Sequence, residues 1–143
     1  MPRFYSYLNF NGTTEEAFNF YKSVFGGEFS EVHRFSETPD AQNLSEDIRN
    51  KLMHISLPLP GGSILMATDA LEAMGQHLVV GNNVSISIDA DSLAQAQEYF
   101  GKLSVGGKIE MPFEKAFWGA FFGSLVDRFG IQWMINFDEG LSK

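Results

Sequence analysis

The sequence contains no cysteine, few basic residues and no long apolar segment, and each shortage removes a class of function. Without cysteine the 143-residue chain can form no disulfide, no thiolate metal site and no thiol nucleophile. Its 10 Lys and Arg residues against 18 Asp and Glu residues give a formal charge of -8, which disfavours nucleic acid and anionic membranes as partners. No stretch approaches the roughly 18 apolar residues of a membrane span. We therefore expect a protein that binds neither nucleic acid nor membranes.

The first residues, Met1-Pro2-Arg3-Phe4, carry no apolar segment of the length that a secretory signal needs, so we expect a cytoplasmic protein. The chain is long enough for one domain with a sizeable core. Its 14 Phe residues are many for this length. These rings must either fill the core or line a binding site.

The chain contains an internal repeat. An apolar strand, a helix ending in two aromatic residues and a pair of glycines follow one another twice. The matched segments are Leu8-Asn9-Phe10 with Ile86-Ser87-Ile88, Phe20-Tyr21 with Tyr99-Phe100, and Gly26-Gly27 with Gly106-Gly107. Their offsets of 78, 79 and 80 residues indicate a duplication.

Farther along, the repeat continues with a shorter offset. Residues 62–66 (Gly-Ser-Ile-Leu-Met) match residues 130–134 (Gly-Ile-Gln-Trp-Met) at an offset of 68. The first copy should therefore carry about twelve extra residues, which we place in the polar stretch Ser36 to Arg49.

Each copy predicts the order strand, helix and three strands. Thr13 and Glu16 have the spacing of a capping box before the first helix, and Asp91 is expected to cap the second. Gly26-Gly27 should end the first helix. Apolar residues recur at three- and four-residue steps in the first helix, so it should have one buried face.

This pattern predicts an α+β fold made of two tandem βαβββ modules, about residues 1–70 and 82–138, within a single domain of residues 1–143. One helix should pack on the outside of each module. The uncovered faces of the two mixed sheets should then form a cupped groove, which is a suitable place for a small ligand.

Motifs along nearly the whole chain carry a resemblance to a known group of proteins. They are Tyr7-Leu8-Asn9-Phe10-Asn11-Gly12, Glu16-Ala17, Phe20-Tyr21, Phe25-Gly26, Lys108-Ile109-Glu110-Met111, Phe117-Trp118, Phe122-Gly123, Asp127-Arg128-Phe129-Gly130 and Trp133-Met134-Ile135-Asn136. The chain resembles the vicinal oxygen chelate superfamily, which includes glyoxalase I, extradiol dioxygenases, and bleomycin and fosfomycin resistance proteins. More narrowly, it looks like the PhnB-like branch, which has no single agreed reaction.

The resemblance implies a divalent metal held by His, Gln or Glu at four strand positions, two in each half. The corresponding residues here are Tyr5, Met66, Asn83 and Met134. Thioether suits soft Cu(I), and a phenol or an amide alone binds divalent ions weakly. We therefore expect no metal at this inherited site, and no cofactor.

Methionine replaces the expected ligand in both halves, at Met66 and Met134. Two flexible, polarizable side chains could line the floor of an adaptable apolar pocket. They could equally fill the space that a metal would occupy.

His54 is the histidine that lies inside a predicted strand, and a group that titrates near neutrality suits a general base. If Ile55 and Leu57 face the helix, His54 and Ser56 face the groove. A structural role for this imidazole is the alternative.

Further residues are predicted to surround a ligand in the groove, although hydrogen bonding among themselves or core packing would explain each one separately. The complete predicted set is Tyr5, Tyr7, Asn9, Met66, Asn83, Ser85, Trp118, Met134 and Asn136. The acidic residues Asp69, Asp89, Glu110 and Glu114 have no spacing that requires them to converge, and solvated edge positions would account for most of them.

We therefore expect a protein that binds a small, partly apolar molecule without the superfamily's usual metal, and that forms a homodimer as many relatives do. An enzyme is the competing class. It would be a metal-dependent lyase or dioxygenase, or a metal-independent enzyme with His54 as base. A structural or partner-binding module with a filled groove is a third class.

Overall fold

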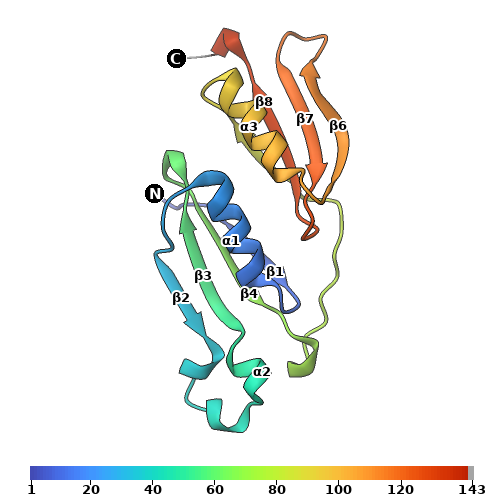
Figure 1. The fold of residues 1–143 in the computed structure, drawn as a ribbon. Helices are drawn as coiled ribbons and strands as arrows, with labels where there is room; N and C mark the ends of the chain where they lie inside the picture. The colour runs from blue at the N-terminus through green and yellow to red at the C-terminus, as the bar shows by residue number, and fades with distance from the viewer. Residues whose placement is uncertain (142–143) are drawn as a thin grey trace. The chain divides into compact units, whose positions relative to one another are not determined.

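The computed structural model describes residues 1–141, which divide into two compact units with a boundary between Val79 and Val80 (Figure 1). This boundary falls in the connector expected between the two repeats. Each unit contains a four-stranded mixed sheet with one long helix, so the prediction of an α+β fold with two tandem βαβββ modules is confirmed. None of the helices in the described chain has the length and apolar character needed to cross a bilayer.

The first unit has strand order β1-β4-β3-β2, with β1 parallel to β4 and the other neighbours antiparallel. Its elements are β1 (Ser6–Phe10), α1 (Thr14–Phe25), β2 (Glu31–Arg34), α2 (Glu46–Arg49), β3 (Leu52–Pro58) and β4 (Ile64–Asp69). Its short 3-10 turns are η1 (Phe35–Glu37), η2 (Ala41–Asn43), η3 (Pro60–Gly62) and η4 (Glu72–Met74).

The second unit repeats this topology with strand order β5-β8-β7-β6. Its elements are β5 (Ile86–Asp89), α3 (Leu93–Leu103), β6 (Lys108–Lys115), β7 (Phe121–Val126), β8 (Gln132–Phe137) and η5 (Glu139–Leu141). The strand β5 pairs in parallel with β8, as β1 does with β4.

The connection between the second and third strands differs in length between the two units. Residues 35–51 connect β2 to β3, whereas residues 116–120 connect β6 to β7, so the first connection is longer by 12 residues (17 against 5). The extra residues form η1, η2 and α2. The insertion therefore lies where the change of offset predicts it.

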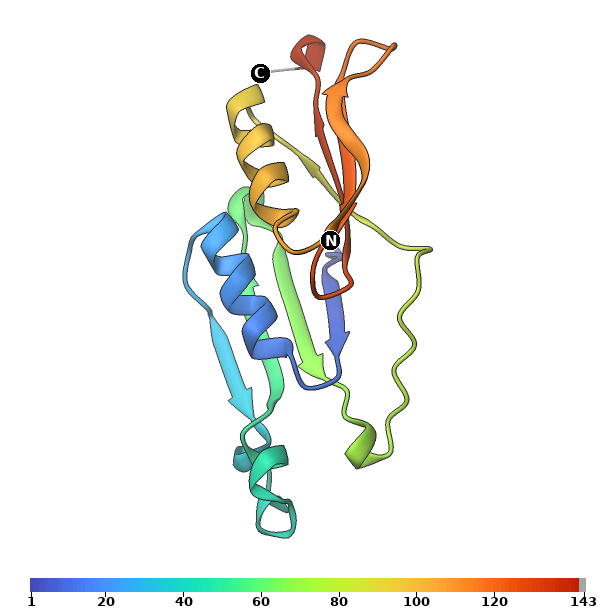
Figure 2. The same cartoon turned by 45° about the vertical axis from the view of Figure 1, so that its right-hand side comes forward.

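In each unit the long helix covers one face of its sheet (Figures 1 and 2). Helix α1 contacts β3 and β4, and α3 contacts β7 and β8. The largest fully buried side chains at these contacts include Phe18, Tyr21, Ile55, Leu57 and Leu65 in the first unit, and Leu103, Leu125, Trp133 and Ile135 in the second. Burial of apolar surface on one face of each sheet thus holds each helix in place.

The start of α1 is organised by a side chain from β4. One carboxylate oxygen of Asp69 accepts hydrogen bonds from the Thr14 backbone nitrogen at 3.1 Å and the Thr14 hydroxyl at 2.7 Å. The same oxygen accepts from the Gly12 nitrogen at 3.0 Å, and the second oxygen accepts from the Leu52 nitrogen at 2.8 Å. Asp69 is buried, so it is not one of the solvated edge residues expected among the four acidic candidates.

The helix caps differ from those expected. Thr13 makes no side-chain capping hydrogen bond, because the Asp69 carboxylate occupies the helix start, so the predicted Thr13–Glu16 capping box is wrong. The cap of α3 is Ser92, whose hydroxyl accepts from the Gln95 nitrogen at 3.1 Å, and not Asp91. Gly26 ends α1 as predicted, with a φ of 79° that favours glycine.

Candidate functional site

The face of each sheet opposite its helix carries the residues that chemistry could use, and we call it the helix-free face. In the first unit Ile55, Leu57 and Leu65 are buried against the helix side. Side chains alternate along a strand, so His54 and Ser56 lie on the helix-free face. Met53 is an extra residue of β3 opposite the step from His33 to Arg34 in β2, so the alternation of β3 changes there and Leu52 also faces the helix side.

Cross-strand pairing arranges the helix-free face of the first unit in rows. One row crosses all four strands and consists of Glu31, Ser56, Met66 and Tyr7. Beside it, His33 pairs with His54, and Asn9 pairs with Thr68. This face therefore combines a thioether, an aromatic ring, imidazoles and short polar groups.

The helix-free face of the second unit has matching rows. The first consists of Met111, Ser124, Met134 and Ser87, and the second of Glu114, Phe122, Asn136 and Asp89. A methionine of the central strand lies opposite a serine in both units, as Met66 with Ser56 and Met134 with Ser124. The duplication has thus kept a Met–Ser pair at one position of each sheet.

The same registers correct the alignment of the first strands. Tyr7 pairs with Met66 and Ser87 pairs with Met134, so the strands match at an offset of 80, and the predicted offset of 78 is wrong by two residues. A shift of two residues keeps every side chain on the same face. It does move the position equivalent to Tyr5 from Asn83 to Ser85.

A chain of hydrogen bonds crosses the helix-free face of the first unit. The Tyr7 hydroxyl lies 2.9 Å from His54 Nδ1, and His54 Nε2 lies 2.8 Å from the Ser56 hydroxyl. Burial raises the pKa of Tyr7, so this phenol stays protonated at neutral pH and can donate. When Tyr7 donates to Nδ1, the proton of a neutral imidazole is on Nε2 and is donated to Ser56.

Two acidic side chains, Glu31 of β2 and Glu37 of η1, lie beside the histidines of this face. Glu31 Oε2 lies 3.5 Å from His33 Nε2, and Glu31 Oε1 lies 3.9 Å from His54 Nε2. Glu37 lies 3.0 Å from His33 Nδ1. The hydrogen bond to Glu37, with further help from Glu31, raises the pKa of His33. The two imidazole rings stack with centroids 6.4 Å apart.

The second unit has aromatic rings at the corresponding place. Trp118 belongs to the turn between β6 and β7, and its ring centroid lies 6.3 Å from that of Phe122 on the helix-free face. Phe117 packs edge-on against Trp118 at 5.0 Å. Phe117 and Trp118 are 98% and 56% exposed and lie before β7, which begins at Phe121.

The structure brings most of the predicted site residues onto the two helix-free faces. In the first unit these are Tyr7, Asn9, His54 and Met66; in the second they are Met134 and Asn136, with Trp118 contacting that face. Tyr5 directly precedes β1 and is half-buried. Asn83 and Ser85 are exposed and lie before β5, outside any strand.

The residues at the inherited metal positions do not suit a divalent ion. Met66 and Met134 offer thioether sulfur, Tyr5 offers a phenol, and the fourth position offers the Ser85 hydroxyl or the Asn83 amide. No group of three His, Asp or Glu side chains within residues 1–141 has an arrangement that could hold a metal ion. We therefore derive no chemistry through a metal at these positions.

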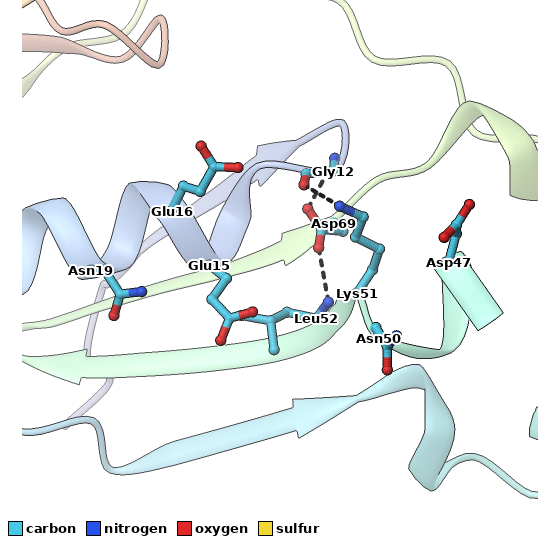
Figure 3. Close-up of a pocket in the computed structure, with 9 residues that line it drawn as sticks. All are labelled: Gly12, Glu15, Glu16, Asn19, Asp47, Asn50, Lys51, Leu52 and Asp69. Atoms are coloured by element: carbon cyan, nitrogen blue, oxygen red, sulfur yellow. Dashed lines mark hydrogen bonds between the residues drawn. The ribbon is translucent and has the colours of Figure 1, made fainter.

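A hollow of about 580 Å³ lies elsewhere in the first unit, beside the start of α1 (Figure 3). It is lined by Gly12, Glu15, Glu16, Asn19, Asp47, Asn50, Lys51, Leu52 and Asp69. Several of its polar groups already have partners. Lys51 Nζ donates to the Gly12 carbonyl at 2.9 Å, and Glu15 receives two hydrogen bonds from Arg34 at 2.7 and 3.0 Å.

Sequence reasoning missed several residues that the structure places at these sites. Ser124 and Phe122 were not predicted, although Ser56 and Ser124 differ by the same 68 residues as Met66 and Met134. That matching offset is the signal that would have identified Ser124. Glu31 carried no local signal, because only cross-strand pairing brings it beside His54.

The sequence is similar to those of known proteins. Residues 2–136 match the family described as 3-demethylubiquinone-9 3-methyltransferase. The chain is 28% identical over 138 residues to protein YjdN of Escherichia coli (strain K12), and the match covers 91% of each chain.

Solved structures show the same fold. Protein PA1353 from Pseudomonas aeruginosa has a TM-score of 0.83 and 36% identity, with 96% of this chain and 98% of that chain covered. A PhnB protein from Bacillus cereus has a TM-score of 0.77 at 24% identity, covering 95% and 99%. A glyoxalase/bleomycin resistance protein/dioxygenase family enzyme from Burkholderia phytofirmans has a TM-score of 0.62 at 18% identity, covering 92% and 96%, and shares the fold alone. The chain therefore belongs to the 3-demethylubiquinone-9 3-methyltransferase family, and it has the fold of the PhnB protein and of the glyoxalase/bleomycin resistance protein/dioxygenase family enzyme.

Proposed function

We propose that this protein binds a small, partly apolar molecule on the helix-free faces of its sheets, without a metal at the inherited ligand positions. The observation that carries the proposal is the repeated Met–Ser pair, Met66 with Ser56 and Met134 with Ser124. Methionine supplies a flexible apolar contact, and a neighbouring hydroxyl can orient a polar group of the ligand.

The composition of the faces supports a ligand that is apolar in part only. Tyr7 is 45% exposed, and the Tyr7–His54–Ser56 chain offers donors and acceptors next to Met66. Asn136 and Phe122 adjoin Met134 in the same way in the second unit. A surface that only had to be covered by protein would be more stable with apolar residues, because each buried polar group without a partner costs about 1–3 kcal/mol.

The hollow beside α1 fits this function less well. Its buried carboxylate, Asp69, is fully used by the backbone groups at the start of α1 and β3. Lys51 and Glu15 have partners within the same unit. The helix-free faces also offer Met66, Met134 and aromatic rings, whereas the described residues that line the hollow include no methionine or aromatic ring.

A thermal-shift screen of the untagged protein tests the proposal. The panel contains small water-soluble aromatic and aliphatic metabolites, together with S-adenosylmethionine, because the family description names methyl transfer. A ligand at 100 times its dissociation constant adds about 2.7 kcal/mol, which raises the melting temperature by several degrees. The rise in melting temperature that a ligand causes should be lost in Met134→Lys and kept in Met74→Lys. Met74 is the control because it is 40% exposed and lies in η4, outside the strands of the sheet. A complete absence of hits would favour a structural module instead.

An enzyme with His54 as general base is the second candidate, and the hydrogen-bonded Tyr7–His54–Ser56 chain favours it. Such a chain fixes the imidazole tautomer and orientation, which a base requires. A metal-dependent lyase or dioxygenase remains the third candidate. Metal analysis of untagged protein tests it, because that enzyme would contain a stoichiometric divalent ion.

A further inference from the structure

We propose that the helix-free face of the second unit takes the cationic nitrogen of a small organic ligand, held between the Trp118–Phe122 rings and the Glu114 carboxylate. This inference rests on the proposed function, because it assigns a chemical class to the ligand of one face. Three observations support it: the exposed Trp118–Phe122 ring pair, the Glu114 carboxylate beside it, and a Lys115 side chain that points to the other side of the sheet.

The aromatic part is an exposed pair of rings rather than a buried one. Trp118 is 56% exposed and contacts Phe122 with ring centroids 6.3 Å apart at an angle of 57°. Phe117 packs edge-on against the same indole at 5.0 Å and leaves it more than half exposed. Trp is the aromatic side chain that attracts cations most strongly, and choline-like ammonium groups are bound in this way.

Carboxylates lie at both ends of the row that contains Phe122. Glu114 pairs directly with Phe122 across β6 and β7, and Asp89 pairs with Asn136 at the other end. Phe113 packs against Phe100 of α3, so its neighbour Glu114 faces the helix-free side. Among residues 1–141 no ion pair is found for Glu114, which leaves its charge available to a ligand.

The neighbouring lysine of β6 points away from this place. Lys115 Nζ lies 6.0 Å from the ring centroid of Phe121, and Phe121 alternates with Phe122 along β7. Its positive charge is therefore directed to the other side of the sheet. The excess of carboxylate over cationic groups beside the rings, in a chain of net charge -8, favours a positively charged ligand group.

The first unit does not offer the same environment. His54 occupies the position equivalent to Phe122, since Ser56 and Ser124 are equivalent, and His33 pairs with it where Glu114 pairs with Phe122. Imidazoles can become cationic, and the pKa of His33 is raised by its acidic neighbours. A preference for cations should therefore belong to the second unit alone.

The test compares choline with 3,3-dimethylbutan-1-ol, which has the same shape but no charge. Binding to the full chain is followed by NMR through the two indole N–H signals, one from each Trp residue. Trp133 serves as the internal reference, because it is buried and donates to Asp127 at 2.9 Å. We expect the Trp118 signal to shift saturably with choline, with an affinity about two- to fivefold higher than for the neutral probe. That preference should weaken at high salt.

Matched variants locate the charge. Glu114→Gln should lower choline affinity about two- to fivefold, whereas Glu110→Gln, which removes the same charge from the same exposed strand, should leave it unchanged. Equal affinity for the two probes would overturn the cation assignment and leave the proposed function standing. An equal effect of the two variants, or a shift confined to Trp133, would also overturn it. If neither probe shifts Trp118, this inference is wrong, and the thermal-shift panel decides the proposed function separately.

Discussion

The Tyr7 hydroxyl lies 2.9 Å from His54 Nδ1 on the helix-free face of the first unit. This contact joins β1 to β3 across β4, although the two residues are 47 positions apart in the sequence. It gives His54 a fixed orientation, and replacing His54 tests whether its imidazole acts as a base.

Replacement of His54 by Phe should leave the fold intact, because Phe122 occupies the equivalent register position in the second unit. We expect a change of less than about 1 kcal/mol in the free energy of unfolding, since the lost hydrogen bonds are partly exposed. Urea denaturation measures this change. If a substrate is found, loss of turnover in this folded variant would support His54 as the base, and full turnover would exclude that role.

Asp69→Ala should be strongly destabilising. The Asp69 carboxylate is buried and accepts four hydrogen bonds, and its removal leaves backbone donors at the start of α1 and β3 without a partner. We expect a loss of about 3 kcal/mol or more in the free energy of unfolding.

The matched control for that change is Asp47→Ala. Asp47 is exposed in the first turn of α2, and its replacement should change stability by no more than about 0.5 kcal/mol. Similar midpoints for the two variants in urea would contradict the role given to Asp69.

Two glycine-to-alanine changes in the second unit should have opposite effects on the free energy of unfolding. A Cβ at Gly123 would lie 2.8 Å from Phe113 Cα and 2.7 Å from Phe100 Cε1, so β6 or α3 must move. We expect Gly123→Ala to cost about 1–3 kcal/mol. Gly101 lies within α3 with open space around it, so Gly101→Ala should stabilise by about 0.5–1 kcal/mol. Calorimetric melting temperatures that moved in the same direction would contradict this packing.

The His33–Glu37 contact should make stability depend on pH. Glu37 raises the pKa of His33, and His33 lowers the pKa of Glu37. The contribution of His33 to stability is fully present below the ordinary histidine pKa of about 6.5. It is lost as the pH rises through the raised pKa of His33 in the folded protein. The Glu37 contribution is present above the ordinary glutamate pKa and is lost as pH falls through the lowered value.

NMR titration of the His33 ring signals measures this coupling. The midpoint should lie above about 6.5 and should fall in Glu37→Gln. A midpoint that did not respond to that substitution would show that Glu37 is not the main cause of the shift.

The fold could be predicted from the sequence because local signals agreed with one another. Gly26 ends α1, the Met66 and Met134 strands match at an offset of 68, and the extra residues fall between β2 and β3. The helix caps were less predictable, because the backbone at the start of α1 donates to the Asp69 carboxylate at the end of β4. No local pattern records such a long-range hydrogen bond.

The candidate site was predictable where it depended on alternation along a strand. The phase of His54 followed from Ile55 and Leu57, and it holds because both of these residues are buried on the helix side of the sheet. The position of Trp118 did not follow, because a turn has no alternation. The partners of His54 required the register of β2, which sequence spacing does not supply.

The methyl NMR signals of the methionines show whether a ligand binds on the helix-free faces without a metal. The chain has six Met residues, so protein labelled with carbon-13 at the methionine methyl groups gives a small set of assignable signals. For a ligand from the screen, we expect saturable shifts at Met66 and Met134, no shift at Met74, and an unchanged affinity after treatment with a metal chelator. Binding that leaves both the Met66 and Met134 signals in place, or that disappears when metal is removed, would contradict metal-free binding on these faces.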